Sequence, residues 1–103
     1  VRETAESFIA AVRVKLPKTQ IHFLGLPYVR RTSTNPEGRA LIRRFNEELA
    51  KLAEKQPKVT FIDLAPAFLD DGSNFRPDLF VKDGTHFSHR GYALVAGLLR
   101  DKL

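Results

Sequence analysis

An aspartate and a histidine three positions apart, Asp83 and His86, are the residues whose types and spacing best suit chemistry. At this spacing the carboxylate can accept the imidazole Nδ1–H, which sets the tautomer and leaves Nε2 free as a general base or acid. The pair therefore predicts two of the three members of a hydrolase triad. An ordinary exposed turn is the alternative, because Asp-Gly is a common turn pair and short motifs match by chance.

A third titratable residue, His89, follows His86 at the same spacing, and Asp83, His86 and His89 together could be imagined as metal ligands. We expect His89 instead to lie exposed in the first turn of the last helix, so no metal site is predicted. The chain has no cysteine, which excludes disulfides, thiolate zinc sites and a cysteine nucleophile. No cofactor is expected.

No serine stands in a recognisable nucleophile context. None of the chain's serines is part of a Gly-Asp-Ser or Gly-x-Ser-x-Gly segment. They are Ser7, Ser33, Ser73 and Ser88. A general base needs a nucleophile to activate and donors that stabilise the developing oxyanion. We therefore expect that the chain does not hydrolyse esters unaided.

A basic stretch follows the first predicted strand. Its arginines are Arg30, Arg31, Arg39, Arg43 and Arg44. Loops after parallel strands open toward the ligand crevice, so Arg30 and Arg31 could contact an anionic substrate group. The favoured alternative is a solvated face, on which Arg43 and Arg44 pair with Glu47 and Glu48.

The net charge of +5 permits an acidic partner. Few aromatic residues interleave with the arginines, however, so nucleic-acid binding is the least favoured function.

The elements that must position these residues form an alternating pattern. Apolar residues at helical spacing predict a helix over 3–16 that Pro17 ends, and a second helix from the Asn35 N-cap with Pro36 to the residues before Pro57. Apolar runs at 21–26 and 59–64 predict strands, the first of them buried on both faces. Strand, helix, strand implies a right-handed parallel crossover.

A final helix, the apolar faces of the middle and last helices, and one long loop complete the pattern. Ser88 is the expected N-cap of a final helix. The predicted apolar stripes are Leu41, Phe45, Leu49 and Leu52 on the middle helix, and Tyr92, Val95, Leu98 and Leu99 on the last one. Residues 65–82 form a connection long enough to suggest a functional role.

Two parallel strands do not form a self-sufficient sheet, so the strand at 21–26 needs a neighbour. Either an N-terminal segment of the same protein or a second copy pairing edge to edge could supply it. The chain begins at Val1 rather than Met and shows no membrane span or targeting segment. We expect a processed or incomplete N-terminus.

The segment from Phe80 to Tyr92, which runs Phe-Val-Lys-Asp-Gly-Thr-His-Phe-Ser-His-Arg-Gly-Tyr, resembles the last conserved block of the SGNH hydrolases, the GDSL-type esterases and lipases. In that family an Asp, two residues and the catalytic His precede a capped turn and a Gly-Tyr pair in the final helix. Residues 23–27 look like the family's fourth strand, and residues 59–64 look like its fifth. The resemblance covers essentially all of residues 1–103, but only about half of the family's usual domain.

The resemblance implies a partial flavodoxin-like, three-layer α/β/α fold, with 1–103 as the C-terminal half of the domain. By the family pattern, Asp83 orients His86, and His86 acts as base toward a serine on an N-terminal half, present in cis or in trans. The implied reaction is cofactor-free hydrolysis of a small carboxylic ester. Phe87, beside His86, could line the acyl pocket.

The alternative is a non-catalytic remnant that self-associates through its exposed sheet edge as a structural or binding protein. The residues do not indicate a cellular compartment.

Overall fold

The computed structural model describes residues 2–103, and Val1 lies outside them. Four helices and two strands follow in the order α1 (Arg2–Lys15), β1 (Ile21–Leu24), α2 (Arg30–Ser33), α3 (Pro36–Lys55), β2 (Val59–Ile62) and α4 (His89–Lys102). Two single 3-10 turns, η1 (Pro66–Phe68) and η2 (Pro77–Leu79), interrupt the long connection before α4. Among these described helices, none is both long and apolar enough to cross a bilayer.

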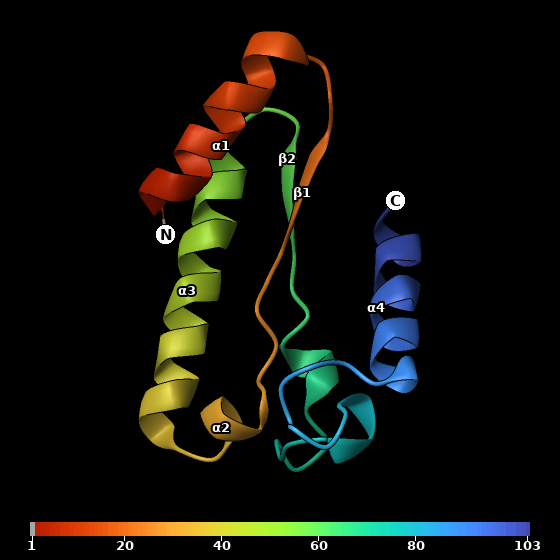
Figure 1. Ribbon diagram of the computed structural model, residues 1–103. Helices are drawn as coiled ribbons and strands as arrows, with labels where there is room; N and C mark the ends of the chain where they lie inside the picture. The colour runs from red at the N-terminus through yellow and green to blue at the C-terminus, as the bar shows by residue number, and fades with distance from the viewer. Residues whose placement is uncertain (1) are drawn as a thin grey trace.

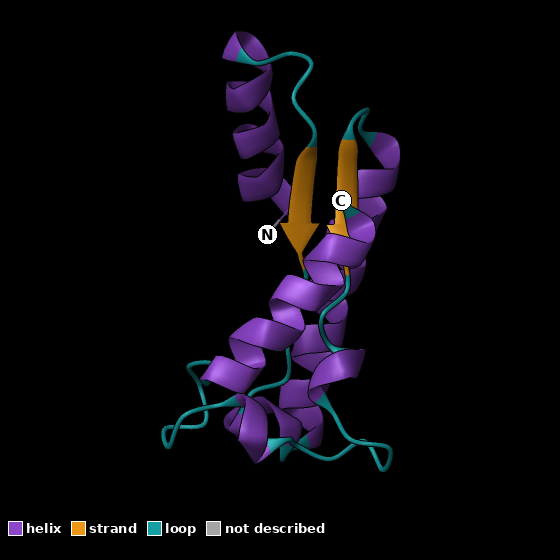
Figure 2. Cartoon of the chain, turned by 90° about the vertical axis from the view of Figure 1, so that its right-hand side faces the viewer, coloured by secondary structure: helices purple, strands orange, loops and turns teal. Residues whose placement is uncertain are grey.

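The elements form three layers. In Figure 1, α1 and α3 lie on one side of the two strands and α4 lies on the other. The strands are parallel, with Ile21 opposite Val59 and Leu24 opposite Ile62, and both arrows point the same way in Figure 2. The predicted α/β class with two parallel strands is confirmed.

Both strands end two residues earlier than their apolar runs predict. After Leu24, one more ladder bond joins the Gly25 amide to the Ile62 carbonyl at 2.8 Å, and the chain then leaves the sheet. Leu24 is 40% and Leu26 is 39% exposed, so within residues 2–103 the first strand is not buried on both faces. The faces of a strand are covered by helices, and α4 packs on the end of β2 and the long connection rather than on β1.

The helix boundaries follow the predicted signals. The Asn35 side chain accepts a hydrogen bond from the Gly38 amide at 2.5 Å, and Pro36 occupies the first turn of α3. The Ser88 hydroxyl likewise accepts the Gly91 amide at 3.2 Å at the start of α4. The short helix α2, in contrast, lies where the sequence predicts only the end of a strand and a loop.

Two of the predicted stripe residues are wrong. Leu41 is 60% exposed, and Ile42 takes its place in the buried face of α3. Tyr92 is 63% exposed, whereas Leu94 joins Val95 in packing against the core. Successive positions on a helix differ in direction by about 100°, so only the packing partner decides which of several nearby apolar residues faces inward.

The core consists of two separate clusters. The first cluster joins α1, α3 and the beginnings of both strands: Ala5, Ile9, Ile21, Leu49, Leu52, Ala53 and Val59. The second cluster joins the end of β2, the long connection and the inner face of α4 around Ile62, Leu64, Phe68, Leu79 and Phe80. The second cluster supports the loop that carries Asp83 and His86.

Candidate active site

The loop between η2 and α4 is a closed turn that carries Asp83 and His86. Phe80 and Phe87 form an antiparallel bridge across its base, and the Val81 amide donates to the His86 carbonyl at 2.9 Å. The Gly84 amide donates to the Val81 carbonyl at 2.9 Å. Gly84 has a φ of 71°, which favours glycine because a Cβ is strained there.

Asp83 orders the turn through both carboxylate oxygens. Its Oδ1 accepts the Thr85 amide at 2.8 Å and the His86 amide at 3.0 Å. Its Oδ2 lies 2.5 Å from His86 Nδ1. The His86 and Thr85 amides, and then the His86 ring, hold the pKa of the Asp83 carboxyl well below its ordinary value. Asp83 is therefore a carboxylate at neutral pH, in position to accept the Nδ1–H.

His86 is 77% exposed at its side chain. Within residues 2–103 its Nε2 makes no hydrogen bond to another protein group. An imidazole that is held at Nδ1 and open at Nε2 can take a proton from a nucleophile and return it to a leaving group. The contact predicted between Asp83 and His86 is therefore present, with the Nδ1 side of the ring turned to the carboxylate.

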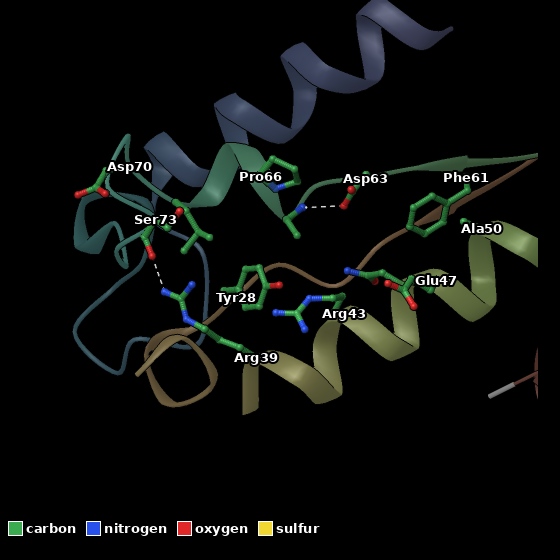
Figure 3. A pocket seen from close by; sticks show the side chains of 13 residues that line it. Tyr28, Arg39, Arg43, Glu47, Ala50, Phe61, Asp63, Pro66, Asp70 and Ser73 are labelled. Atoms are coloured by element: carbon green, nitrogen blue, oxygen red, sulfur yellow. Dashed lines mark hydrogen bonds between the residues drawn. The ribbon is translucent and has the colours of Figure 1, made fainter. Parts of the chain in front are cut away.

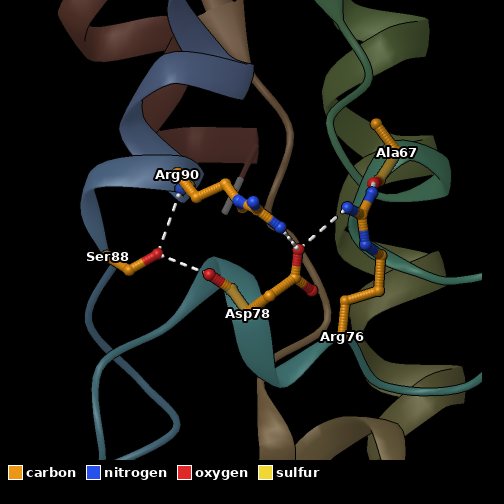
Figure 4. Close-up of polar contacts among 6 residues, drawn as sticks. Ala67, Arg76, Asp78, Ser88 and Arg90 are labelled. Carbon is orange, nitrogen blue, oxygen red and sulfur yellow. Dashed lines mark hydrogen bonds and ion pairs between the residues drawn. The ribbon is translucent and has the colours of Figure 1, made fainter.

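A second aspartate, Asp78, ties this loop to α4, as Figure 4 shows. Its Oδ2 lies 3.1 Å from Arg76 and 3.5 Å from Arg90, and its carbonyl accepts the Ser88 hydroxyl at 2.7 Å. The bond from Arg76 is the main reason that the pKa of Asp78 is lowered. Asp78 thus joins η2 to the N-terminal turn of α4, at the two ends of the segment that carries the pair.

Phe87, the residue predicted beside an acyl pocket, packs against the second cluster. Its half-buried ring stacks on Phe68 with centroids 5.0 Å apart and meets the ring of Tyr92 edge-on at 5.4 Å. The ring therefore anchors the C-terminal side of the loop to the core.

The two arginines predicted near the substrate lie on α2 and have different surroundings. Arg30 Nη1 donates to the Lys82 carbonyl at 3.0 Å, and its guanidinium lies 5.2 Å from the centroid of the Phe75 ring. Arg31 is exposed, and its side chain has no ion pair or hydrogen bond within the described part of the chain. The expected pairing of Arg43 and Arg44 with glutamates is likewise not found among residues 2–103.

Two of the serines have structural roles. Ser33 is buried and donates to the Arg30 carbonyl at 3.1 Å, and Ser88 serves as the helix cap. None of the serine hydroxyls within 2–103 is hydrogen-bonded to His86.

The structure also contains a hollow of about 510 Å³ that the sequence did not predict (Figure 3). It lies between α3, the segment after β1 and the loop after β2, and neither Asp83 nor His86 lines it. Its charged lining is mixed, with Arg39, Arg43 and Glu47 on α3, and Asp63 and Asp70 on the chain after β2. The carboxylate of Asp63 accepts the Ala65 amide at 3.1 Å and so supports the start of the loop after β2.

His89 is exposed in the first turn of α4, as predicted. Across residues 2–103, no group of three His, Cys, Asp or Glu side chains is placed to hold a metal ion.

Comparison with known sequence families gives one assignment. The model of the GDSL-like Lipase/Acylhydrolase family matches residues 1–94, which is most of the chain. A search of curated protein sequences gives no significant match.

Solved structures support the same fold. One similar chain, a candidate platelet activating factor from Streptococcus pneumonia, superposes with a TM-score of 0.84 at 22% identity. It matches 98% of the present chain and 49% of its own. Another is the esterase domain of the ORF1 protein of the zebrafish ZfL2-1 retrotransposon, with a TM-score of 0.77 at 28% identity over 97% of the present chain and 58% of its own. The chain thus spans about half the length of the structures that it matches.

Proposed function

The chain belongs to the GDSL-like lipase/acylhydrolase family, and from this premise we propose that it supplies the orienting acid and the base of a serine esterase. Asp83 is the orienting acid and His86 is the base. The serine nucleophile and the oxyanion hole come from the other half of the domain. The substrate class is a small carboxylic ester, in keeping with the family's description and with a structural relative described as an esterase domain.

One observation carries the proposal: the contact of 2.5 Å between Asp83 Oδ2 and His86 Nδ1, on a histidine whose side chain is largely exposed. The hydrogen bonds from the Thr85 and His86 amides keep the Asp83 carboxylate ionised. The carboxylate therefore accepts the Nδ1–H and stabilises the imidazolium that forms during the reaction. The same bonds restrict the rotation of both side chains. The His86 Nε2 atom is thereby left accessible to the serine of the other half of the domain.

In the first half of the reaction, His86 Nε2 removes the hydroxyl proton of the incoming serine as its oxygen attacks the ester carbonyl. The resulting oxyanion requires backbone donors from the other half. His86 then gives the proton to the alkoxide, which leaves as an alcohol, and an acyl-enzyme remains.

In the second half of the reaction, water replaces the serine as nucleophile. His86 removes a proton from the water as it attacks the acyl carbonyl, and returns it to the serine oxygen as the carboxylic acid leaves. Asp83 keeps the same carboxylate form throughout. No redox step or external cofactor is needed to balance either half.

The proposed partner is the N-terminal half of the domain, docking at the open edge of β1. Exposed apolar residues lie on this side of the molecule: Phe8 on α1, and Leu24 and Leu26 at and after the end of β1. The neighbouring structures contain about as much additional chain as a second half requires. A second copy of the same chain pairing at this edge is the competing arrangement.

The test uses the complete protein that contains this chain. With p-nitrophenyl acetate as substrate, His86→Ala is expected to lower kcat by at least about 10³-fold, because triad members act as a unit. His89→Ala is the matched control. It removes an exposed histidine only three positions away and is expected to leave turnover unchanged.

Turnover that survives His86→Ala would overturn the assignment. A complete protein that carries a serine nucleophile, folds cooperatively and yet turns over no ester would favour the non-catalytic alternative instead. In that case, a self-associated state in ultracentrifugation is the further expectation.

A further inference from the structure

We propose that Arg30 is a positioning residue that holds the Asp83–His86 turn in place by hydrogen bonding to the backbone on both sides of Asp83. The inference rests on the proposed function, because it assigns a role in the same site. It gives the arginine a task different from the anion contact that the sequence suggests.

Arg30 contacts the turn twice. Its side-chain Nη1 donates to the carbonyl of Lys82 at 3.0 Å. Its backbone amide donates to the carbonyl of Gly84 at 3.0 Å. The two acceptors are the carbonyls of the residues immediately before and after Asp83, so one residue restrains the position of the aspartate from both directions.

Side-chain packing reinforces these two hydrogen bonds. A Cβ on Gly84 would lie 2.8 Å from Arg30 Cβ and 2.9 Å from its guanidinium carbon, so the arginine side chain lies directly against the glycine. The guanidinium also lies 5.2 Å from the centroid of Phe75, a ring that packs against the second cluster. Ring contact and hydrogen bond together limit the rotation of a long side chain, which would otherwise be mobile.

The hydrogen bond from Arg30 to Lys82 connects two parts of the site that are 52 positions apart in the chain. Arg30 begins α2, in the segment that follows β1, whereas Asp83 and His86 lie just before α4. In the proposed whole domain, β1 borders the half that carries the serine. Arg30 therefore sets the distance of the His86 imidazole from that half, and a misplacement of about 1 Å between reacting groups can cost a hundredfold in rate.

Arg30→Met in the complete protein tests this role. The backbone bond to Gly84 and much of the side-chain bulk remain, while the bond to Lys82 and the cationic contact with Phe75 are lost. We expect kcat to fall about tenfold to a hundredfold with KM within about twofold, because ground-state substrate contacts are untouched. Arg30→Lys retains a donor and is expected to recover part of the loss.

A second readout does not depend on turnover. In Arg30→Met the Gly84 amide, which closes the turn by donating to Val81, is expected to exchange with solvent faster, while the protection of β2 amides is unchanged. The control is Arg44→Met, which removes an exposed arginine on α3. It is expected to change neither kcat nor this exchange rate.

The outcomes separate cleanly. In Arg30→Met, a rise in KM with unchanged kcat would show that Arg30 binds substrate. Unchanged kcat, KM and exchange of the Gly84 amide would show that Arg30 does not position the turn. Either result overturns the inference. If His86→Ala leaves activity intact, the proposed function fails, and the exchange readout alone decides for Arg30. Should Arg30→Met not fold, the decision passes to Arg30→Lys, which is expected to lose part of the activity and part of the protection of the Gly84 amide. Full activity and unchanged exchange in that variant would overturn the inference.

Discussion

A single carboxylate organises the proposed site. Asp83 accepts two backbone amides through one oxygen and the His86 ring through the other. The amides belong to the residues that follow within the same turn, so the side chain and the local backbone shape stabilise each other. This explains how a solvent-exposed aspartate can hold a histidine without burial.

The lowered pKa of Asp83 gives a testable pH dependence. The pKa of the Asp83 carboxyl in the folded state lies below its value in the unfolded chain, which is about 3.9 for aspartate. The carboxylate therefore stabilises the turn fully at a pH above the unfolded-state pKa. Its contribution is lost as the pH falls through the folded-state pKa. We expect the Asp83 carboxyl carbon, followed by NMR in the complete protein, to titrate at lower pH than the same carbon in the urea-unfolded protein. Coincident midpoints would contradict the hydrogen-bonded turn.

At the scale of elements, Asn46 joins α3 to the chain that leaves β1. Its side-chain oxygen accepts the Leu26 amide at 2.7 Å, and its Nδ2 donates to the Leu26 carbonyl at 3.0 Å. A buried amide that faces the backbone in this way continues the pairing pattern of a strand beyond the end of the sheet. The segment that leads to α2 and Arg30 is thereby held against α3.

We expect Asn46→Ala to lower the free energy of unfolding by about 2–4 kcal/mol, because it leaves a part-buried amide and carbonyl without partners. Chemical denaturation of the complete protein measures the change. Glu48→Ala, an exposed substitution on the same helix, is the control and is expected to stay within about 0.5 kcal/mol. A loss of similar size in both variants would show that the helix, rather than the amide pair, is responsible.

Another long-range contact closes the opposite end of the sheet. Arg13 on α1 donates to the carbonyls of Thr19 at 2.6 Å, Pro57 at 2.9 Å and Lys58 at 3.1 Å. These carbonyls lie in the turns that precede β1 and β2. The arginine thus aligns the beginnings of both strands, whereas Asn46 guides the chain at the exit of β1.

At the scale of the whole molecule, residues 2–103 have an open shape. The radius of gyration is 14.8 Å, compared with about 13 Å for a compact domain of this length. The core is divided into two clusters, and apolar side chains are exposed on the β1 side. These exposed apolar side chains support the proposal that the rest of the domain covers the β1 edge.

Hydrogen exchange in the complete protein tests this arrangement. The amides of Ile21 and Gly25 point toward β2, so by alternation those of His22 and Leu24 point to the open edge of β1. If a strand of the other half pairs there, His22 and Leu24 are expected to exchange slowly. The outward amides of β2, those of Val59 and Phe61, are the controls and are expected to exchange fast, because the fifth strand of a flavodoxin-like sheet is an edge. Fast exchange at His22 and Leu24 would contradict docking at β1.

Much of the fold could be predicted from the sequence, because its signals are local. Pro17, the Asn35 cap and the Ser88 cap mark helix ends through contacts within one turn of chain. The spacing of Asp83 and His86 likewise suffices to predict their contact, since both lie in one short turn. Their role in catalysis remains the prediction that the His86→Ala experiment tests.

Tertiary structure alone decided which apolar face turns inward and what the long-range side chains contact. Ile42 rather than Leu41 is buried because the packing of α3 selects one of two neighbouring positions. Arg30 contacts Lys82, and Asn46 contacts Leu26, across separations of 52 and 20 positions. No local pattern encodes such pairs, because they form only after the strands, helices and connecting loop have packed together.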